Sequence, residues 1–68
     1  HTDEIRERIR HNRNCALQTR QLVMRMSAYD KLIESEEKYA DDSLKLLRSA
    51  KDVLRQKLTA VRARRIHD

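Results

Sequence analysis

Three histidines and one cysteine are the side chains of this 68-residue sequence that most readily bind metals or act in catalysis. His1, His11 and His67 are too far apart to share the short spacings of metal ligands, so we interpret them as solvated surface residues. Cys15 has no second thiol with which to form an intrachain disulfide or a zinc site. We treat it as an ordinary thiol that flanks the apolar side of a helix.

Acidic residues gather in the middle of the chain, where Glu36 and Glu37 precede Asp41 and Asp42. Neighbouring residues of a helix point in different directions, so we interpret this cluster as a solvated acidic surface and not as a pair of catalytic acids. The absence of glycine excludes a glycine-rich loop around a phosphate. We therefore predict no catalytic residue, no metal site and no cofactor, and we expect a non-enzymatic protein.

Arginines near both ends offer a different chemistry, because guanidinium groups bind phosphate. If an anionic partner binds, the sequence predicts contacts from Arg6, Arg10, Arg13, Arg62, Arg64 and Arg65. The net charge of +5 agrees with such contacts, but two tyrosines are the only aromatic residues on which bases could stack. Nucleic acid is therefore not the partner we expect. An anionic membrane surface stays an open alternative, because each basic residue gains about 1 kcal/mol near such lipid.

The segment RHNRNCALQTR, residues 10–20, resembles the basic region of leucine-zipper transcription factors through Asn12, Arg13, Ala16 and Arg20. This resemblance implies a helix that contacts nucleic acid. Downstream, steps of seven residues from Leu22 reach Tyr29, Glu36, Ser43 and Ala50. These are not leucines, so no leucine zipper follows the basic segment.

The composition indicates an all-α protein, with 40% charged residues, 38% hydrophobic residues and neither glycine nor proline. Thr2, Asp3 and Glu4 suit the start of a helix, because a hydroxyl can cap it and carboxylates face its positive end. The simplest prediction is one amphipathic helix over nearly the whole chain, roughly 95 to 100 Å long, in a coiled coil or multi-helix bundle. Acid-to-base pairs four residues apart, such as Asp41 and Lys45, favour this continuity.

An antiparallel helical hairpin is the alternative architecture. A bend could fall near Ser27, or within ADDS at residues 40–43, where Asp41, Asp42 or Ser43 could cap a second helix. Neither place contains glycine or proline, the usual residues of a chain reversal. We therefore expect the continuous helix before the hairpin.

Apolar residues recur at alternating steps of four and three, which is the heptad pattern of helices that pack along one side. A second series, one position over, overlaps the first from about residue 22 onward, so the stripe widens there. We predict that a partner-binding seam contains Ile5, Ile9, Leu22, Val23, Met26, Tyr29, Ile33, Ala40, Leu44, Leu47, Leu54, Leu58 and Val61. A stripe of this width suits three or more helices better than a two-stranded zipper.

Four polar residues interrupt the seam, namely Asn12, Asp30, Glu37 and Lys51. Such residues can set the register between helices, or they can lie at the solvated margin of the seam, and both interpretations stay open. The net charge is +3 over residues 1–29, −4 over residues 30–42 and +6 over residues 43–68, in agreement with +5 for the whole chain.

These charge blocks disfavour two arrangements, because each sets like charges together. One is a parallel in-register homodimer, and the other is a hairpin folded near residue 33. We expect instead that partner helices form a hetero-oligomer or a staggered antiparallel homo-oligomer with this chain. The predicted function is assembly, tethering or scaffolding through the apolar seam.

The segment ESEEKYADDSLKLLRSAKDVL, residues 34–54, resembles the amino-terminal half of a SNARE helix, in which an acidic E-[ST]-E precedes small residues and heptad-spaced leucines. The resemblance implies packing with partner helices in membrane trafficking, which we keep as an alternative function. That family carries a central Gln or Arg, where this sequence has Leu47.

No apolar run approaches the roughly 18 to 20 residues that a membrane span requires. We therefore expect an intracellular, cytoplasmic location. Because His1 stands where a complete chain would begin with Met, we interpret residues 1–68 as a single helical segment of a longer protein.

Overall fold

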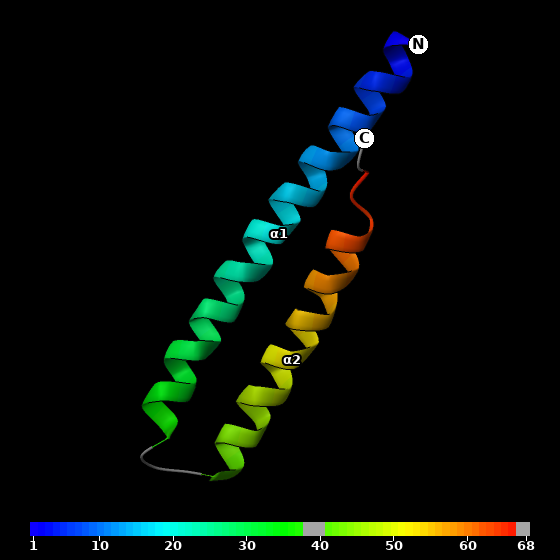
Figure 1. Ribbon diagram of the computed structural model, residues 1–68. Helices are drawn as coiled ribbons and strands as arrows, with labels where there is room; N and C mark the ends of the chain where they lie inside the picture. The colour runs from blue at the N-terminus through cyan, green and yellow to red at the C-terminus, as the bar shows by residue number, and fades with distance from the viewer. Residues whose placement is uncertain (38–40, 67–68) are drawn as a thin grey trace.

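The computed structural model describes residues 1–37 and 41–66, which form two α-helices (Figure 1). Helix α1 spans Thr2–Glu36 and helix α2 spans Asp41–Ala63. They lie side by side and antiparallel in a rod whose principal extents are 58, 15 and 13 Å. The start of α1 and the end of α2 lie together at what we name the open end, and the opposite end is the turn end.

The all-α prediction is confirmed, and the hairpin is the arrangement that the chain adopts. The expectation of one continuous helix is wrong, because α1 ends at Glu36 and α2 runs back along it. Of the two suspected bends, Ser27 lies inside α1, whereas α2 begins within the ADDS segment. The pair Asp41 and Lys45 lies within α2, so it supports that helix and carries no information about continuity with α1.

The described end of α1 has no left-handed residue. Glu37 keeps right-handed helical angles (φ −52°, ψ −24°), and its N–H donates to the carbonyl of Ile33 at 2.9 Å. Asp41 and Asp42 then lie in the first turn of α2, where carboxylates favour the positive end of the helix dipole. Residues 38–40, with the predicted seam residue Ala40, lie outside the described residues.

The start of α1 differs slightly from the prediction. His1 occupies the capping position without a side-chain hydrogen bond, and its carbonyl accepts from the N–H of Ile5 at 3.2 Å. Thr2 is therefore the first helical residue and not the cap. Asp3 and Glu4 lie in the first turn, as the sequence predicts.

The core is a thin layer between the two helices. Both helices contribute its buried side chains, which are Cys15, Leu22, Leu54, Leu58 and Val61. Met26 and Tyr29 are partly buried and pack against this cluster. Folding back buries much of the apolar stripe that a single helix would leave in water, which favours the hairpin. The basic blocks of α1 and α2 do lie along each other, but their charges are exposed and therefore screened by water and salt.

Each of the four polar seam residues forms a contact between the first half of the hairpin and the second. Asp30 forms an ion pair with Lys51, and a carboxylate oxygen of Glu37 lies 3.8 Å from Arg48. The Asn12 amide nitrogen donates to the Ile66 carbonyl, and its oxygen accepts from the Ile66 N–H, both at 2.9 Å. These contacts join both ends of the hairpin in one register.

Candidate interaction face

One side of the hairpin carries an open groove along the line where α1 and α2 meet near the open end. Its volume is about 930 Å³, and its apolar lining includes Leu22 and Met24 from α1 with Ala60, Val61 and Ala63 from α2. Three cations also line it: Arg25, Lys57 and Arg64. No acid is among its described lining residues, so the groove is apolar at its base and positive at its rim.

Large apolar side chains also lie beyond the groove in both directions along the helices. Met24 lies in the groove, and steps of seven and eight residues from it reach Leu17 and Leu32 along α1. On α2, steps of seven back from Ala60 reach Val53 and Leu46. Their side-chain exposures are far above those of the core: Leu17 52%, Met24 67%, Leu32 51%, Leu46 75% and Val53 48%. We name these five residues, with Ala28, Ala50 and Ala60 between them, the apolar face.

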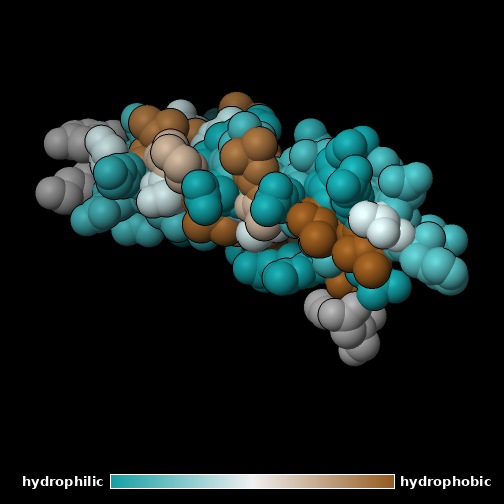
Figure 2. All heavy atoms as spheres, turned by 90° about the horizontal axis from the view of Figure 1, so that it is seen from above, coloured by the Kyte–Doolittle hydropathy of each residue, from teal (hydrophilic) through white to brown (hydrophobic). Residues whose placement is uncertain are grey.

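Hydrophilic residues flank the exposed apolar ones, as Figure 2 shows for one view of the rod. Neither Arg25 nor Lys57 has an ion-pair partner within residues 1–37 and 41–66. Arg64 donates a long hydrogen bond of 3.4 Å to the side-chain oxygen of Gln18. The cations beside the face are therefore available to carboxylates from outside the chain.

The other side of the hairpin is polar and internally paired. There Arg48 meets Glu37, and Arg55 donates to Asp52 at 3.4 Å. Gln56 donates to the second carboxylate oxygen of Asp52, also at 3.4 Å. The two sides of the helix pair thus differ, because one exposes apolar groups beside cations without ion-pair partners and the other carries these polar pairs.

The predicted seam residues fall into two groups in the structure. Those that contact the opposite helix or lie partly buried are Leu22, Met26, Tyr29, Ile33, Leu44, Leu47, Leu54, Leu58 and Val61. Ile5, Ile9 and Val23 are 56%, 46% and 45% exposed. The first two lie on the part of α1 that extends beyond α2 (Figure 1), so no described residue of α2 covers them. Whether the seam also binds a partner stays a prediction.

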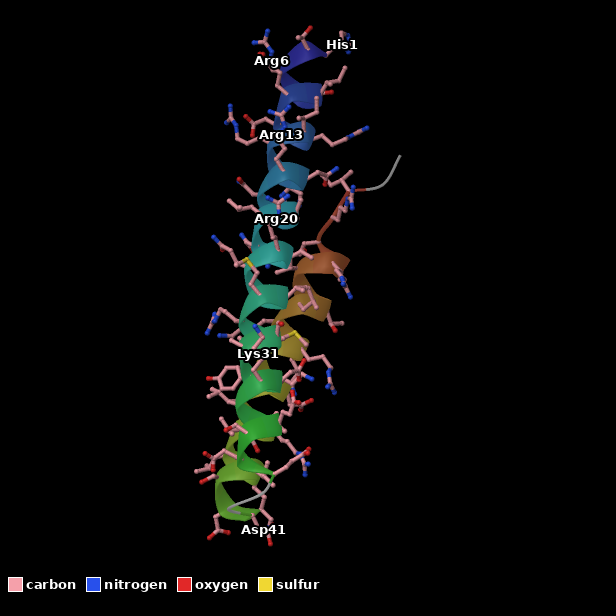
Figure 3. The ribbon with its side chains drawn as sticks, turned by 90° about the vertical axis from the view of Figure 1, so that its left-hand side faces the viewer. His1, Arg6, Arg13, Arg20, Lys31 and Asp41 are labelled. Atoms are coloured by element: carbon pink, nitrogen blue, oxygen red, sulfur yellow. The ribbon has the colours of Figure 1, made fainter. Side chains whose placement is uncertain are left out.

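The predicted phosphate contacts gather at the open end but face different ways. Figure 3 shows Arg6, Arg13 and Arg20 one below another along α1, with Lys31 further down. Arg10 donates to Glu7 at 3.0 Å. Arg62 and Arg65 line a small hollow of about 490 Å³ with Cys15, on the side away from Arg64. The hairpin therefore brings the arginines of α1 and those at the end of the chain to the open end, but it does not join them in one site.

Cys15 is a core residue, so the prediction of a flanking thiol is wrong. It is 6% exposed, and its position seven residues before Leu22 extends the second apolar series by one heptad. Its sulfur lies 3.6 Å from Nε2 of His11, and that nitrogen donates to the backbone carbonyl of Arg64 at 2.6 Å, since a carbonyl can only accept. His11 is thus not merely solvated, because it joins α1 to the end of α2.

The apolar face was not among the predicted sites. Leu17 and Met24, and likewise Leu46, Val53 and Ala60, recur every seven residues, so counting sevens outside the main seam would have revealed them. This second periodicity is hard to see in the sequence, because the predicted seam contains more apolar residues and runs along the same helices.

No protein-family model, curated protein or solved structure matches the chain significantly. Within residues 1–37 and 41–66, no three His, Cys, Asp or Glu side chains are grouped to hold a metal ion. Neither helix, over its described residues, combines the length and apolar character of a membrane span. The SNARE-like segment, residues 34–54, is divided between the end of α1 and the start of α2, and the segment that resembles a zipper basic region packs one side on α2 through Cys15.

Proposed function

We propose that this chain is a non-enzymatic interaction module that assembles with partner helices through its apolar face. The observation that carries the proposal is the exposure of five large apolar side chains on a folded hairpin, one of which lines an apolar groove, because exposed apolar surface of this kind usually marks an interface. The inner seam supplies the hairpin contact, and the apolar face supplies a second one. Partner helices would pack on it as additional members of a bundle.

The small core supports the same proposal. Among the described residues no side chain is completely buried, and the core layer holds five buried residues. Chains of this size rarely bury enough surface to be stable alone, and oligomerisation is one of the common remedies. Covering the apolar face would add hydrophobic burial at about 25 cal/mol per Å².

A photo-crosslinking residue tests this function, because it captures whatever polypeptide lies against it. We would place it at Leu46 on the apolar face and, as a control on the same helix, at Arg55 on the polar side. We expect a discrete adduct from Leu46 in cells that contain the protein, and little from Arg55. Equal adduct yields at the two positions, or none at either, would contradict the proposal.

Contact with an anionic membrane surface is a second candidate function. It rests on Arg6, Arg13 and Arg20, which recur every seven residues along α1 (Figure 3) and have no ion-pair partner in the described part of the chain. Binding to anionic vesicles should fall with salt and with Arg13→Glu plus Arg20→Glu. The control Asn14→Glu plus Gln21→Glu adds negative charge to α1 without removing these cations. Equal loss in both variants would show that only net charge matters.

A further inference from the structure

The hairpin converts the three charge blocks of the sequence into a polarised rod. Asp41 and Asp42 are exposed at the turn end, whereas Arg13, Arg20 and Arg64 are exposed toward the open end. Asp42 and Arg64 have no ion-pair partner within the described residues. A partner with the opposite polarity would therefore complement the rod, and this chain turned end for end has that polarity.

Helix register shows which residues lie level across the hairpin. Asp30 pairs with Lys51, and both helices rise by the same amount per residue in opposite directions. Ala28 lies two residues before Asp30 on α1, and Val53 lies two residues after Lys51 on α2. Ala28 and Val53 are therefore level with each other across the hairpin. Val53 is also midway between Leu46 and Ala60, the ends of the apolar face on α2.

We propose that the occupant of the apolar face is a second copy of this chain, packed antiparallel about a two-fold axis that lies in the interface and crosses the rod at the level of Ala28 and Val53. This inference rests on the proposed function and names its partner. Residues at equal distances on either side of the axis then meet. Leu32 meets Met24 of the second copy, and Leu46 meets Ala60 of the second copy.

The same axis pairs opposite charges at both ends of the interface. Asp42 lies eleven residues before Val53 and Arg64 eleven after it, so each Asp42 meets the Arg64 of the other copy. A parallel dimer would instead place the two basic open ends side by side, with like charges a few ångströms apart. The proposed two-fold axis also brings Arg25 and Lys31 of the two copies together, three residues on either side of Ala28. The antiparallel arrangement therefore combines attractive contacts at the ends with one like-charge contact near the axis, each occurring twice, whereas the parallel one brings both basic ends together.

The overlap of the two rods sets the size of the interface. Asp41, where α2 begins, lies about 18 Å along the helix from Val53, so two copies related by this axis overlap over about 36 Å. With a rod width of 15 Å the footprint is on the order of 540 Å² per partner, below the roughly 800 Å² of standard interfaces, so we expect a weak dimer. Ala28 and Ala50 near the axis are small, which lets the four helices approach closely, at the 8 to 10 Å typical of packed helices. The product is an antiparallel four-helix bundle.

Sedimentation equilibrium of the purified chain and a charge swap test the pairing. We expect a monomer–dimer equilibrium whose Kd rises about tenfold with either Asp42→Arg or Arg64→Asp, because each creates two like-charge contacts. The double variant with both changes should return to within about threefold of the original Kd, because opposite charges meet again. Circular dichroism of each variant monitors folding, and the recovered double variant shows that neither change simply unfolds the chain. A monomer at every concentration, or no recovery in the double variant, would overturn the inference.

Disulfide crosslinking tests the face and the axis independently of charge. In a Cys15→Ala background, Val53→Cys places a thiol next to its own copy across the axis, and Arg55→Cys places one on the polar side of the same helix, where Arg55 lies with Asp52 and Arg48. We expect Val53→Cys to form the covalent dimer at least about tenfold faster at the same concentration, in proportion to the higher effective concentration. Equal rates would overturn the proposed interface.

The outcomes separate this inference from the proposed function. A Leu46 photo-adduct with a different polypeptide, together with a monomeric purified chain, would retain the interaction module and overturn the second copy as its occupant. An absence of any Leu46 adduct together with a monomeric chain would overturn both.

Discussion

The inner seam and the apolar face are built from the same residue types at the same spacing, yet they differ in exposure. Leu54 is 3% exposed and Leu46, eight residues away on the same helix, is 75% exposed. The inner seam packs against the other helix, and the apolar face borders a groove with a cationic rim. Heptad spacing thus identifies a helix surface that can pack, but it does not decide which surface packs within the chain and which remains for a partner.

The largest effect should separate these two leucines directly. Leu54→Ala should reduce the free energy of unfolding by about 2 to 5 kcal/mol, because it removes buried contacts and leaves a cavity. Leu46→Ala should change it by no more than about 0.5 kcal/mol, since an exposed side chain loses little on truncation. Urea denaturation at a concentration where the chain is monomeric measures both. Similar losses for the two variants would mean that the seam and the face have been confused.

Cys15 tests whether the inner seam extends to the open end. Cys15→Ser should cost about 1 to 3 kcal/mol, because a hydroxyl replaces an apolar sulfur in the core. Cys15→Ala keeps an apolar side chain and should cost less. Thermal unfolding followed by circular dichroism compares them, and equal stability of both variants would place Cys15 outside the core.

Asn12 tests the polar contact that closes the open end. Asn12→Ala removes both hydrogen bonds to Ile66 and should cost about 1 kcal/mol. Asn14→Ala is the matched control, because Asn14 is exposed and the two substitutions change helix propensity equally. Hydrogen exchange at Ile66 should quicken only in the first variant. If Ile66 exchanges equally fast in both, Asn12 does not hold the end of the chain.

The smallest effect concerns register. A double-mutant cycle of Asp30→Asn and Lys51→Met should give a coupling energy of about 0.2 to 1 kcal/mol, the usual range for ion pairs with exposed partners. The coupling should decrease at high salt, because water reaches Asp30, whose side chain is 55% exposed. A coupling of zero would leave apolar packing alone to set the register.

Much of the fold could be predicted from composition, but the reversal could not. Helix-forming residues dictate helices, and Asp41 and Asp42 were recognised as a suitable helix start. The expectation of a continuous helix rested on local charge pairs and on the missing glycine, whereas the hairpin is favoured by side chains of both helices that pack together in one core. The charge objection failed because exposed like charges repel weakly compared with what burial of the seam contributes.

The candidate interaction face was harder to predict than the inner seam. Leu22, Leu54 and Val61 were selected from heptad spacing, and they lie in the core. Leu46 and Val53 share that spacing on a neighbouring stripe, and periodicity alone ranks such stripes poorly when both contain apolar residues. Their exposure follows from the hairpin, since a helix with one neighbour can cover only one of its stripes.

The sequence by itself determined that this protein is helical, carries heptad-spaced apolar residues and bears charge in three blocks. These properties follow from residue type and local spacing, which do not depend on distant contacts. Only the tertiary structure decided that the chain turns back on itself, that Cys15 packs against α2 and Asn12 against Ile66 beyond it, and that a second apolar surface remains exposed. Those outcomes depend on which residues become neighbours after the reversal, and the free energy of that packing is a property of both helices together.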